Sequence, residues 1–477
     1  MAIQTTQESK GFYKLSWLQR IGFGAGDLAQ NLIYQTICMY LLFFYTDVYV
    51  LGGDPAKSAG LAATMFLVVR LVDVLWDPLV GTFVDKHSPK LGKYRSYLVT
   101  GGIPLTILAI LCFWDGFKPS LIYAYITYVG MSMLYTLINV PYGALNSSLT
   151  RDTNEITVLT STRMFMANVG GLCVSAGVPI LVAFLAWKDV PKQTIETALF
   201  MGLGSLPAFI FMPLVPAIKQ KVGKKNMFYI FLTVAIVGMA FLYIISKFTN
   251  MYEHMWLVYV AQFIKSTGVI VATGYMWALI PEVISYGEYT TGRRISGIVN
   301  ALTGIFFKAG MALGGVIPGL VLAATSYVPK ESEGNALPSD SNAWFLTMLI
   351  FSLVGLSLLI FCFSQTKERV VMDEKETKNV KVSDLWKEFF RNRPLRVIAL
   401  FFITAFAMMS VGNAAGAYFM NGLDQQAPLA QEGIRWLVCV IPALLLGLAM
   451  WIISKYELSD EKIDQINKEI EARSNKE

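Results

Sequence analysis

The chain has 477 residues, of which 55% are hydrophobic and 15% are charged, and its net charge is +6 at pH 7. Soluble domains carry about 25% charged residues and at most about half apolar residues, so this composition excludes that class. The lack of any repeat and a total of only five cysteines exclude collagen and disulfide scaffolds, which leaves a membrane-embedded protein.

Twelve apolar segments predict an all-α membrane protein with twelve transmembrane helices, each about 20 residues or more in length. Lys and Arg gather in alternate loops, for example at Lys219 and Lys221. The positive-inside rule therefore predicts a multi-pass protein of the plasma or inner membrane with both termini in the cytoplasm. The segments are 21–45, 57–83, 96–113, 120–148, 160–186, 195–217, 227–247, 255–281, 295–324, 343–364, 395–418 and 434–454.

The first segment carries a polar stripe, in which Asp27 is followed by Gln30, Asn31 and Tyr34. An ionisable residue at the centre of a bilayer costs about 3 kcal/mol on insertion scales, so it needs a partner or an aqueous cavity. A carboxylate beside amides and a phenol suits a hydroxyl-rich ligand, because hydroxyls need paired donors and acceptors. We therefore expect Asp27, Asn31 and Tyr34 to bind substrate.

The second segment contains Arg70, Asp73 and Asp77 at spacings i, i+3 and i+7. At about 100° per residue these side chains fall within a sector of about 60° on one helix face. Two carboxylates one turn apart either share a monovalent cation or hold a proton, because such close like charges do not both ionise. The alternative is a static salt-bridge network, which holds the bundle together but does not need a doubled carboxylate.

Further polar residues lie in the later segments. Thr136, Asn139 and Arg163 extend the polar set in the fourth and fifth segments, and Lys308 lies in the ninth. Asn139 is equally well explained by a hydrogen bond between helices. Lys265, also within a segment, either extends to the interface or faces the cavity. We expect the charged residues of the first, second and ninth segments to meet around one cavity.

Two charged stretches lie outside the bilayer. Residues 365–394 form a linker in which apolar side chains recur at helical spacing, which predicts an interfacial amphipathic helix that tethers the linker to the membrane face. These side chains are Val382, Leu385, Trp386, Phe389 and Phe390. Residues 455–477 form a cytoplasmic tail that is either a short surface helix or a frayed end.

The sequence lacks the motifs of several chemistries. It has no phosphate-binding P-loop, no nucleotide fingerprint and no HExxH metal motif, so an ATP-driven pump and a membrane protease lack their parts. Its two histidines lie far apart, and its five cysteines are scattered through apolar segments. We therefore expect no enzyme, no cofactor and no metal beyond a coupling Na⁺ or H⁺.

Six motifs resemble those of the glycoside–pentoside–hexuronide:cation symporters, the melibiose permease branch of the major facilitator superfamily. They are GFGAGDLAQNLIY (22–34), MFLVVRLVDVLWDPLVGTFVDK (65–86), GKYRSY (92–97), LYTLINVPYGAL (134–145), STRMFMANVGG (161–171) and IPEVISYGEYTTGRRISGIVNALTGIFFKAG (280–310). The resemblance implies two six-helix bundles around a central cavity that opens alternately to each side of the membrane.

The resemblance also implies roles for individual residues. Asp73 and Asp77 resemble the coupling-cation carboxylates with Thr136 as a further ligand, while Arg70 joins their charge network. Asp27 and Arg163 resemble sugar-binding residues, and Lys308 resembles their charged partner in the opposite bundle. Asn139 stands where the melibiose permease has a sugar-contacting aspartate, and Gly143 replaces its neighbouring aromatic residue. These two departures argue against melibiose as the substrate.

The position of the charged linker departs from the family pattern. In the family this linker follows the sixth helix, whereas here it follows the tenth segment. Residues 343–420 resemble the family's sixth helix, linker and seventh helix, and residues 195–327 resemble its eighth to eleventh helices. The apparent helix order is therefore one to five, eight to eleven, six, seven and twelve. We therefore expect an N-terminal bundle of 1–186 plus 343–364, and a C-terminal bundle of 195–327 plus 395–454. A permuted chain of this kind is either engineered or a natural variant.

The preferred interpretation is a secondary transporter that moves a glycoside, pentoside or hexuronide with a cation by alternating access. Its expected partners are a small sugar, a monovalent cation and the lipid bilayer, without nucleic acid or an obligate protein partner. Two alternatives remain: a lysolipid or drug carrier of related fold, and a rearranged membrane scaffold without transport.

Overall fold

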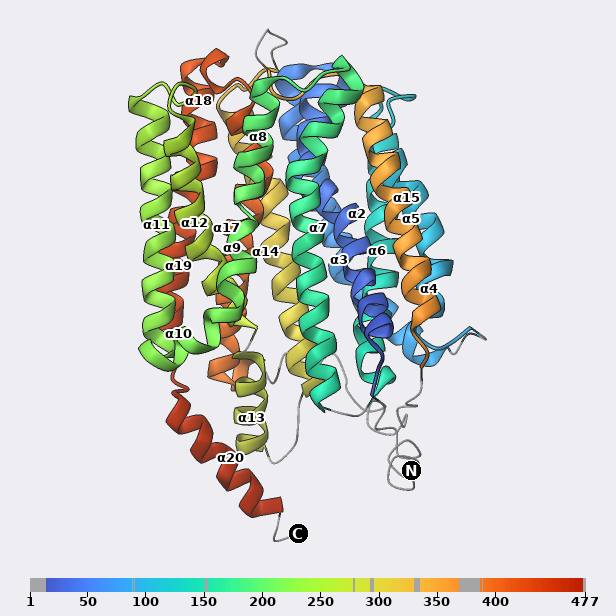
Figure 1. Ribbon diagram of the computed structural model, residues 1–477, viewed down its shortest axis with the longest axis vertical. Helices are drawn as coiled ribbons and strands as arrows, with labels where there is room; N and C mark the ends of the chain where they lie inside the picture. Colours follow the sequence, from blue (N-terminus) through green and yellow to red (C-terminus); the bar gives the residue numbers. More distant parts are fainter. Residues whose placement is uncertain are drawn as a thin grey trace. The chain divides into compact units, whose positions relative to one another are not determined.

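The computed structural model describes residues 14–87, 89, 91–150, 153–277, 279–291, 296–329, 335–368, 387 and 389–474. Within these residues the secondary structure is helical (Figure 1), and eleven helices are long and apolar enough to cross a membrane. A shorter apolar helical stretch, Ser96–Leu111, coincides with the third predicted segment. Each of the twelve predicted segments therefore corresponds to apolar helix.

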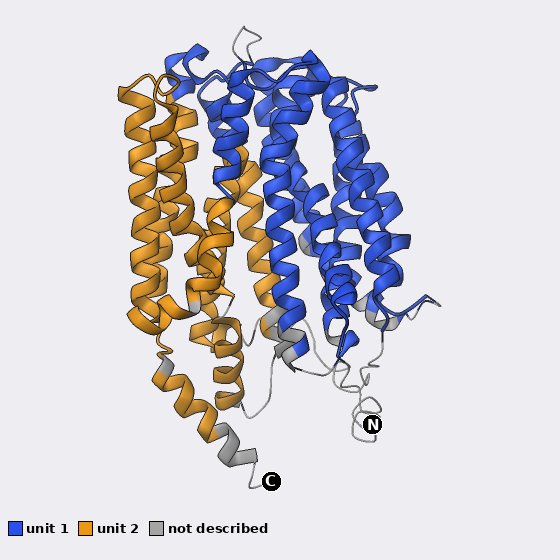
Figure 2. Cartoon of the chain, viewed as in Figure 1, with its two compact units in different colours: residues 1–205, 319–373, 416–431 blue, residues 206–318, 374–415, 432–477 orange. Residues whose placement is uncertain are grey.

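The chain forms two compact units (Figure 2). Unit 1 comprises Met1–Ser205, Gly319–Asp373 and Gly416–Gln431. In unit 1, α2 packs against α7 and α15, α3 packs against α6, and α5 packs against α6 and α15. Its helices are α2 (Trp17–Phe43), α3 (Pro55–Lys86), α4 (Ser96–Thr100), α5 (Gly102–Leu111), α6 (Leu121–Leu149), α7 (Thr153–Trp187), α8 (Lys192–Leu203) and α15 (Ser341–Gln365).

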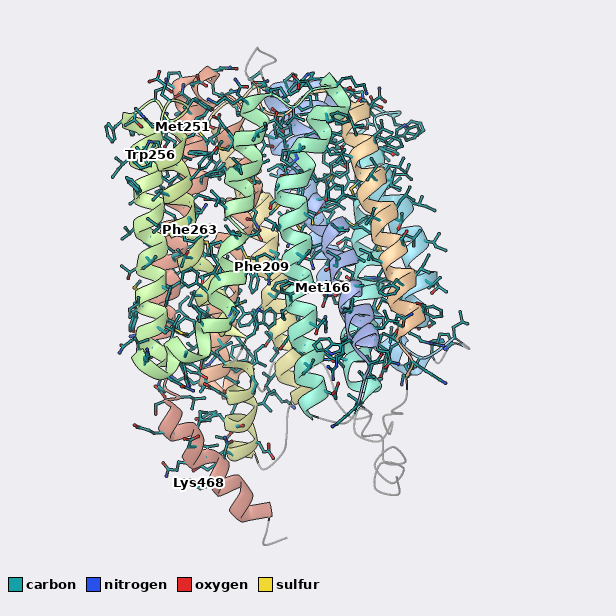
Figure 3. The ribbon with its side chains drawn as sticks, viewed as in Figure 1. Met166, Phe209, Met251, Trp256, Phe263 and Lys468 are labelled. Carbon is teal, nitrogen blue, oxygen red and sulfur yellow. The ribbon has the colours of Figure 1, made fainter. Side chains whose placement is uncertain are left out.

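Unit 2 comprises Leu206–Pro318, Glu374–Ala415 and Glu432–Glu477. In unit 2, α11 packs against α12 and α19, and α13 packs against α20. Figure 3 labels Phe263 on α12 and Lys468 on α20. The helices of unit 2 are α9 (Leu206–Phe211), α10 (Val215–Val222), α11 (Lys224–Phe248), α12 (Met255–Met276), α13 (Leu279–Thr291), α19 (Ile441–Ser454) and α20 (Asp460–Ser474).

Three helices contribute to both units. α14 (Ser296–Ala324) passes from unit 2 to unit 1 between Pro318 and Gly319, and α17 (Arg393–Met420) does so between Ala415 and Gly416. α18 (Pro428–Arg435) begins in unit 1 and ends in unit 2. Pro318 is an internal proline of α14.

Small residues on α2 allow close helix contacts in unit 1. A Cβ atom at Gly26 would lie 2.5 Å from Cε2 of Tyr142 on α6 and 3.0 Å from Sγ of Cys362 on α15. A Cβ at Gly355 on α15 would lie 3.2 Å from the carbonyl oxygen of Ala29. Lipid tails are as apolar as the helices, so close packing of this kind, rather than the hydrophobic effect, favours association of helices in a membrane.

Some predicted segments are broken within the structure. The segment 96–113 divides into α4 and α5 at Gly101, and the segment 195–217 divides into α8, α9, a 3₁₀ turn (Met212–Leu214) and α10. Prolines 207, 213 and 216 lie in this second region and remove backbone donors, which interrupts the helical hydrogen bonds. The segment 434–454 contains a π-helical turn, Trp436–Val440, before α19.

The structure describes most of the charged tail but only a small part of the charged linker. Most of the predicted amphipathic helix at 382–390 lies outside the described residues. The tail contains α20, whose Ile466 is buried. This helix corresponds to the surface-helix alternative for residues 455–477.

Candidate substrate and cation sites in unit 1

The first group of polar residues joins α2 to α7. Arg163 on α7 binds Asp27 on α2 with two hydrogen bonds, from Nε to Oδ2 at 2.5 Å and from Nη2 to Oδ1 at 3.3 Å. The guanidinium also lies 4.6 Å from the ring centroid of Tyr142 and 5.6 Å from that of Phe23. The side chains of Arg163 and Asp27 keep 20% and 14% of their accessible surface. A charged pair beside aromatic rings can bind a polar ring compound such as a sugar.

Two glycines determine how closely α7 approaches α2. A Cβ at Gly24 would lie 2.9 Å from Cγ2 of Thr162 and 3.0 Å from Cγ of Met166, a residue labelled on α7 in Figure 3. A Cβ at Gly170 would lie 2.9 Å from Cβ of Asn31. The absence of these side chains brings the two helices close enough for the bidentate Asp27–Arg163 pair.

The second group of polar residues joins α3 to α6. Arg70 Nη1 donates to Asp73 Oδ2 at 2.9 Å, and Arg70 Nη2 donates to the hydroxyl of Tyr128 at 3.3 Å. The hydroxyl of Ser132 lies 2.7 Å from Oδ1 and 2.9 Å from Oδ2 of Asp73. Arg70 and Asp73 are 9% and 2% exposed. Asp73 is thus a buried carboxylate that has one cationic partner and one hydroxyl partner.

The register of α3 against α6 is informative about Asp77 and Thr136. Arg70 contacts Tyr128, Asp73 contacts Ser132, and Trp76 Nε1 donates to the carbonyl oxygen of Met133 at 3.0 Å, so these partners lie 57 to 59 residues apart in sequence. Extended by one turn, the same offset predicts that Asp77 lies beside Thr136, which is buried. Asp73 and Ser132 are in contact, and the offset predicts a second carboxylate and hydroxyl one turn further on, which are oxygen ligands of the type that hard cations prefer.

A stacked aromatic pair lies near the first group. The rings of Tyr34 on α2 and Tyr135 on α6 are 4.1 Å apart between centroids and nearly parallel. Tyr135 immediately precedes Thr136, so this pair reaches the helix that also carries the hydroxyls of the second group. The stack makes α6 the common element of both groups.

The structure brings some of the predicted site residues into contact within unit 1. It brings Asp27 together with Arg163, and Arg70 together with Asp73. Asn31 points its amide along its own helix, donating to the carbonyl oxygen of Asp27 at 2.9 Å. Lys308 lies on α14 and Lys265 on α12, both within unit 2. The expectation of a single cavity that gathers all these charges stays a prediction.

Sequence reasoning missed Ser132 and Tyr128, which hold Asp73 and Arg70. Their signal was the spacing Tyr128, Ser132 and Thr136 at i, i+4 and i+8, which places three hydroxyls on one face of an apolar helix. Among the described residues no group of three or more His, Cys, Asp and Glu side chains could hold a metal ion, and the five cysteines are free thiols.

Comparison with known proteins gives the following matches. The chain matches the family described as MFS/sugar transport protein over residues 22–197, 187–342 and 332–423. It is 37% identical to the uncharacterized symporter YnaJ of Bacillus subtilis, over 78% of this chain and 95% of that protein. It is 26% identical to the glucuronide carrier protein homolog of Escherichia coli, over 67% of this chain and 86% of that protein. It is 24% identical to the isoprimeverose transporter of Lactiplantibacillus pentosus, over 78% of this chain and 94% of that protein.

These matches bear on the expected order of the helices. The three matched segments follow one another along the chain and overlap at their ends. They give no support to the permuted order that the position of the charged linker suggested, and we do not retain it. A charged linker alone does not identify the helices on either side of it, because any connection between spans can be long and polar.

Proposed function

Because the chain belongs to the MFS/sugar transport protein family, a family of symporters and not of enzymes, we propose that it carries a glycoside, pentoside or hexuronide together with Na⁺ or H⁺. The predicted family and the predicted class of multi-pass helical membrane protein are both confirmed. The eleven long apolar helices and the shorter stretch Ser96–Leu111 are consistent with a fold of about twelve transmembrane helices.

Two relatives support sugar as the substrate. Their names assign glucuronide to one and isoprimeverose to the other. Both are carbohydrates rich in hydroxyls, which agrees with the polar groups on α2, α6 and α7. In this proposal Asp27 and Arg163 bind the sugar, with Asn31, Tyr34 and Asn139 near it. Lys308 would contribute a charge from the other bundle.

The single observation that carries the coupling proposal is the buried Asp73. Asp73 contacts Arg70 and Ser132 between α3 and α6, and the register of these two helices supports Asp77 and Thr136 as further oxygen ligands. A cation or proton that binds Asp73 and Asp77, with Thr136 as a further ligand, reduces their negative charge. The ion pair between Arg70 and Asp73 then becomes weaker. The two bundles then expose the site alternately to each side. Because coupling is reciprocal, sugar should tighten cation binding by the same factor.

The proposal is tested by transport in proteoliposomes. Counterflow of labelled isoprimeverose, a labelled methyl glucuronide and a labelled methyl xyloside is measured with Na⁺, with a proton gradient and with neither. Replacing Asp73 by Asn should abolish cation-driven accumulation. The matched control, Asp54→Asn, changes a carboxylate whose side chain is 44% exposed at the start of α3, and should leave accumulation unchanged.

Each alternative predicts a different result. A lysolipid or drug carrier would bind a labelled lysophosphatidylcholine and none of the three sugars. A scaffold without transport would show no counterflow, and Asp73→Asn would change only its thermal stability. In either case the symport proposal is wrong.

A further inference from the structure

Gln30 on α2 stands out among the buried polar side chains of unit 1. It is 2% exposed, and neither its Oε1 nor its Nε2 has a hydrogen-bond partner among the described residues. A carboxamide offers two donors and two acceptor positions, and a buried polar group normally satisfies them. An amide in this state needs a partner that the protein itself does not supply.

The position of Gln30 places it beside the candidate sugar site. At about 100° per residue it lies about 60° from Asp27 around the helix, and it lies between Gly26 and Tyr34, about 40° from each. Asn31, its neighbour in sequence, faces Gly170 of α7 instead and uses its amide within α2. Of the two amides in the polar stripe, Gln30 is therefore the one with unused hydrogen-bonding capacity.

Two contacts fix what faces Gln30 from α6. One turn before Gln30, the position of Gly26 adjoins the ring of Tyr142. One turn after Gln30, Tyr34 stacks on Tyr135. α2 and α6 are thus antiparallel here, and interpolation between the two contacts gives Ile138 and Asn139 as the residues of α6 at the level of Gln30. Ile138 packs against Gly101, so Asn139 is the polar candidate. Asn139 is partly exposed, and its side chain makes no hydrogen bond with any described residue.

We propose that Gln30 and Asn139 form a pair of carboxamides that hydrogen-bonds two neighbouring hydroxyls of the transported sugar and so determines its specificity. This inference rests on the proposed sugar symport. Each hydroxyl donates one hydrogen bond and accepts others, and an amide provides both functions in one plane. The pair is uncharged, so it also tolerates an acidic sugar that a carboxylate would repel. Both Gln30 amide atoms are covered, so sugar reaches them when the surrounding side chains part and the three rotatable bonds of Gln30 turn.

The test compares Gln30→Met with a matched control on the same helix, Gln35→Met. Gln35 Nε2 already donates to Asn31 Oδ1 at 3.4 Å. Affinity for isoprimeverose, methyl glucuronide and methyl xyloside is measured by the sugar-induced shift in melting temperature of the purified full-length protein. Gln30→Met should weaken binding of the preferred sugar about 10-fold or more, because a site built for hydroxyls loses one of its partners. Gln35→Met should leave the affinity unchanged.

A second readout separates recognition from a structural role. Without sugar, Gln30→Met should melt at a higher temperature than the wild type, because an apolar side chain replaces an unsatisfied buried amide. Asn139→Leu should also weaken binding about 10-fold, and the deoxy form of the sugar that lacks the recognised hydroxyl should bind wild type and Gln30→Met equally weakly.

The outcomes are distinguishable. If the wild type binds a sugar and Gln30→Met binds it equally well, this inference is wrong while the proposed function stands. A lower melting temperature for Gln30→Met with unchanged affinity would assign Gln30 to packing. If the wild type binds none of the three sugars, both this inference and the proposed substrate class are wrong.

Discussion

The Asp27–Arg163 pair combines a binding role with a structural one. Arg163→Gln leaves the carboxylate of Asp27 without its cationic partner inside a membrane helix pair. We expect the variant to lose about 3 kcal/mol of stability, the lower end for buried pairs because both side chains keep some exposure. Melting of the purified protein, followed by tryptophan fluorescence, measures this loss.

The double variant Asp27→Asn with Arg163→Gln serves as its control. It removes both charges, so most of the stability should return while sugar accumulation stays absent. If the double variant melts as low as Arg163→Gln alone, the loss arises from packing of the guanidinium on Tyr142 and not from the unpaired charge.

Ser132 allows the cation site to be tested without removing a charge. Ser132→Ala deletes the hydroxyl that contacts both oxygens of Asp73. We expect the cation concentration for half-maximal transport to rise about 10-fold, as for the loss of one charge-assisted hydrogen bond. The comparison variant is Ser148→Ala on the same helix, whose buried hydroxyl donates to the carbonyl oxygen of Ala144. An equal rise in both variants would contradict a role for Ser132 in cation binding.

Residue patterns identified the polar stripe on the first segment and the Arg70, Asp73 and Asp77 face of the second. They did not distinguish Gln30 from Asn31, because both are amides on one turn and only the neighbours of α2 show which amide is satisfied. Ser132 was missed for the same reason, since its importance comes from Asp73 on another helix and not from its own surroundings in sequence.

At the scale of helices, close packing of α11 and α12 provides a direct test of the structure. A Cβ at Gly268 would overlap the backbone of Phe231 and Ala235. Gly268→Ala should therefore destabilise the protein by about 1–3 kcal/mol through overpacking. Gly447→Ala on α19, where a Cβ would meet no atom within 4 Å, should be neutral or gain up to about 1 kcal/mol from helix propensity. Melting temperatures of the two variants and the wild type, measured in the same detergent, show whether each substitution lowers or raises stability.

The predicted bundles can be examined by cross-linking α7 to α15. A Cβ at Gly177 would lie 3.4 Å from Cζ of Phe351. With the native cysteines replaced, Gly177→Cys and Phe351→Cys should be joined efficiently by a short bifunctional thiol reagent. Pairing Gly177→Cys with a cysteine at Gly447 is the control. Efficient linkage in the control alone would refute the proposed bundle of 1–186 plus 343–364.

The broken helices show where apolar pattern is insufficient. Hydropathy predicts that 195–217 crosses the membrane, but it does not register that the prolines between Ser205 and Lys219 lack backbone donors. The sequence contained this signal in its proline positions. Pro442 likewise follows the π-helical turn at Trp436–Val440 and lacks the donor that would bond to Val438 in an α-helix.

At the scale of the whole molecule, orientation in the membrane is still a prediction. Lys57, at the start of α3, and Lys221, at the end of α10, are both exposed. In a background without native cysteines, Lys57→Cys should react with an impermeant maleimide on intact cells, and Lys221→Cys only after the membrane is opened. The reverse pattern would place the termini outside.

Composition and periodicity were enough to predict an all-α membrane protein and its twelve apolar segments, because the bilayer imposes length and hydropathy on every span. Helix partners were harder to predict. Contacts of α15 with α2, α5 and α7 depend on the shapes of small residues such as Gly26 and Gly355, and hydropathy does not encode shape. The permuted helix order was inferred from the place of one linker and from local resemblances on either side of it, and the match to the family gives that order no support.

The passage of α14 and α17 through both units has a mechanical consequence. A helix is stiff along its axis, and α14 is continuous from Lys308 to its end. A displacement near Lys308 is therefore transmitted along the helix, because no flexible loop interrupts it. Pro318 lacks the amide hydrogen that would hold the preceding turn, so bending of α14 at this step requires less energy than bending at a turn with its full set of backbone bonds.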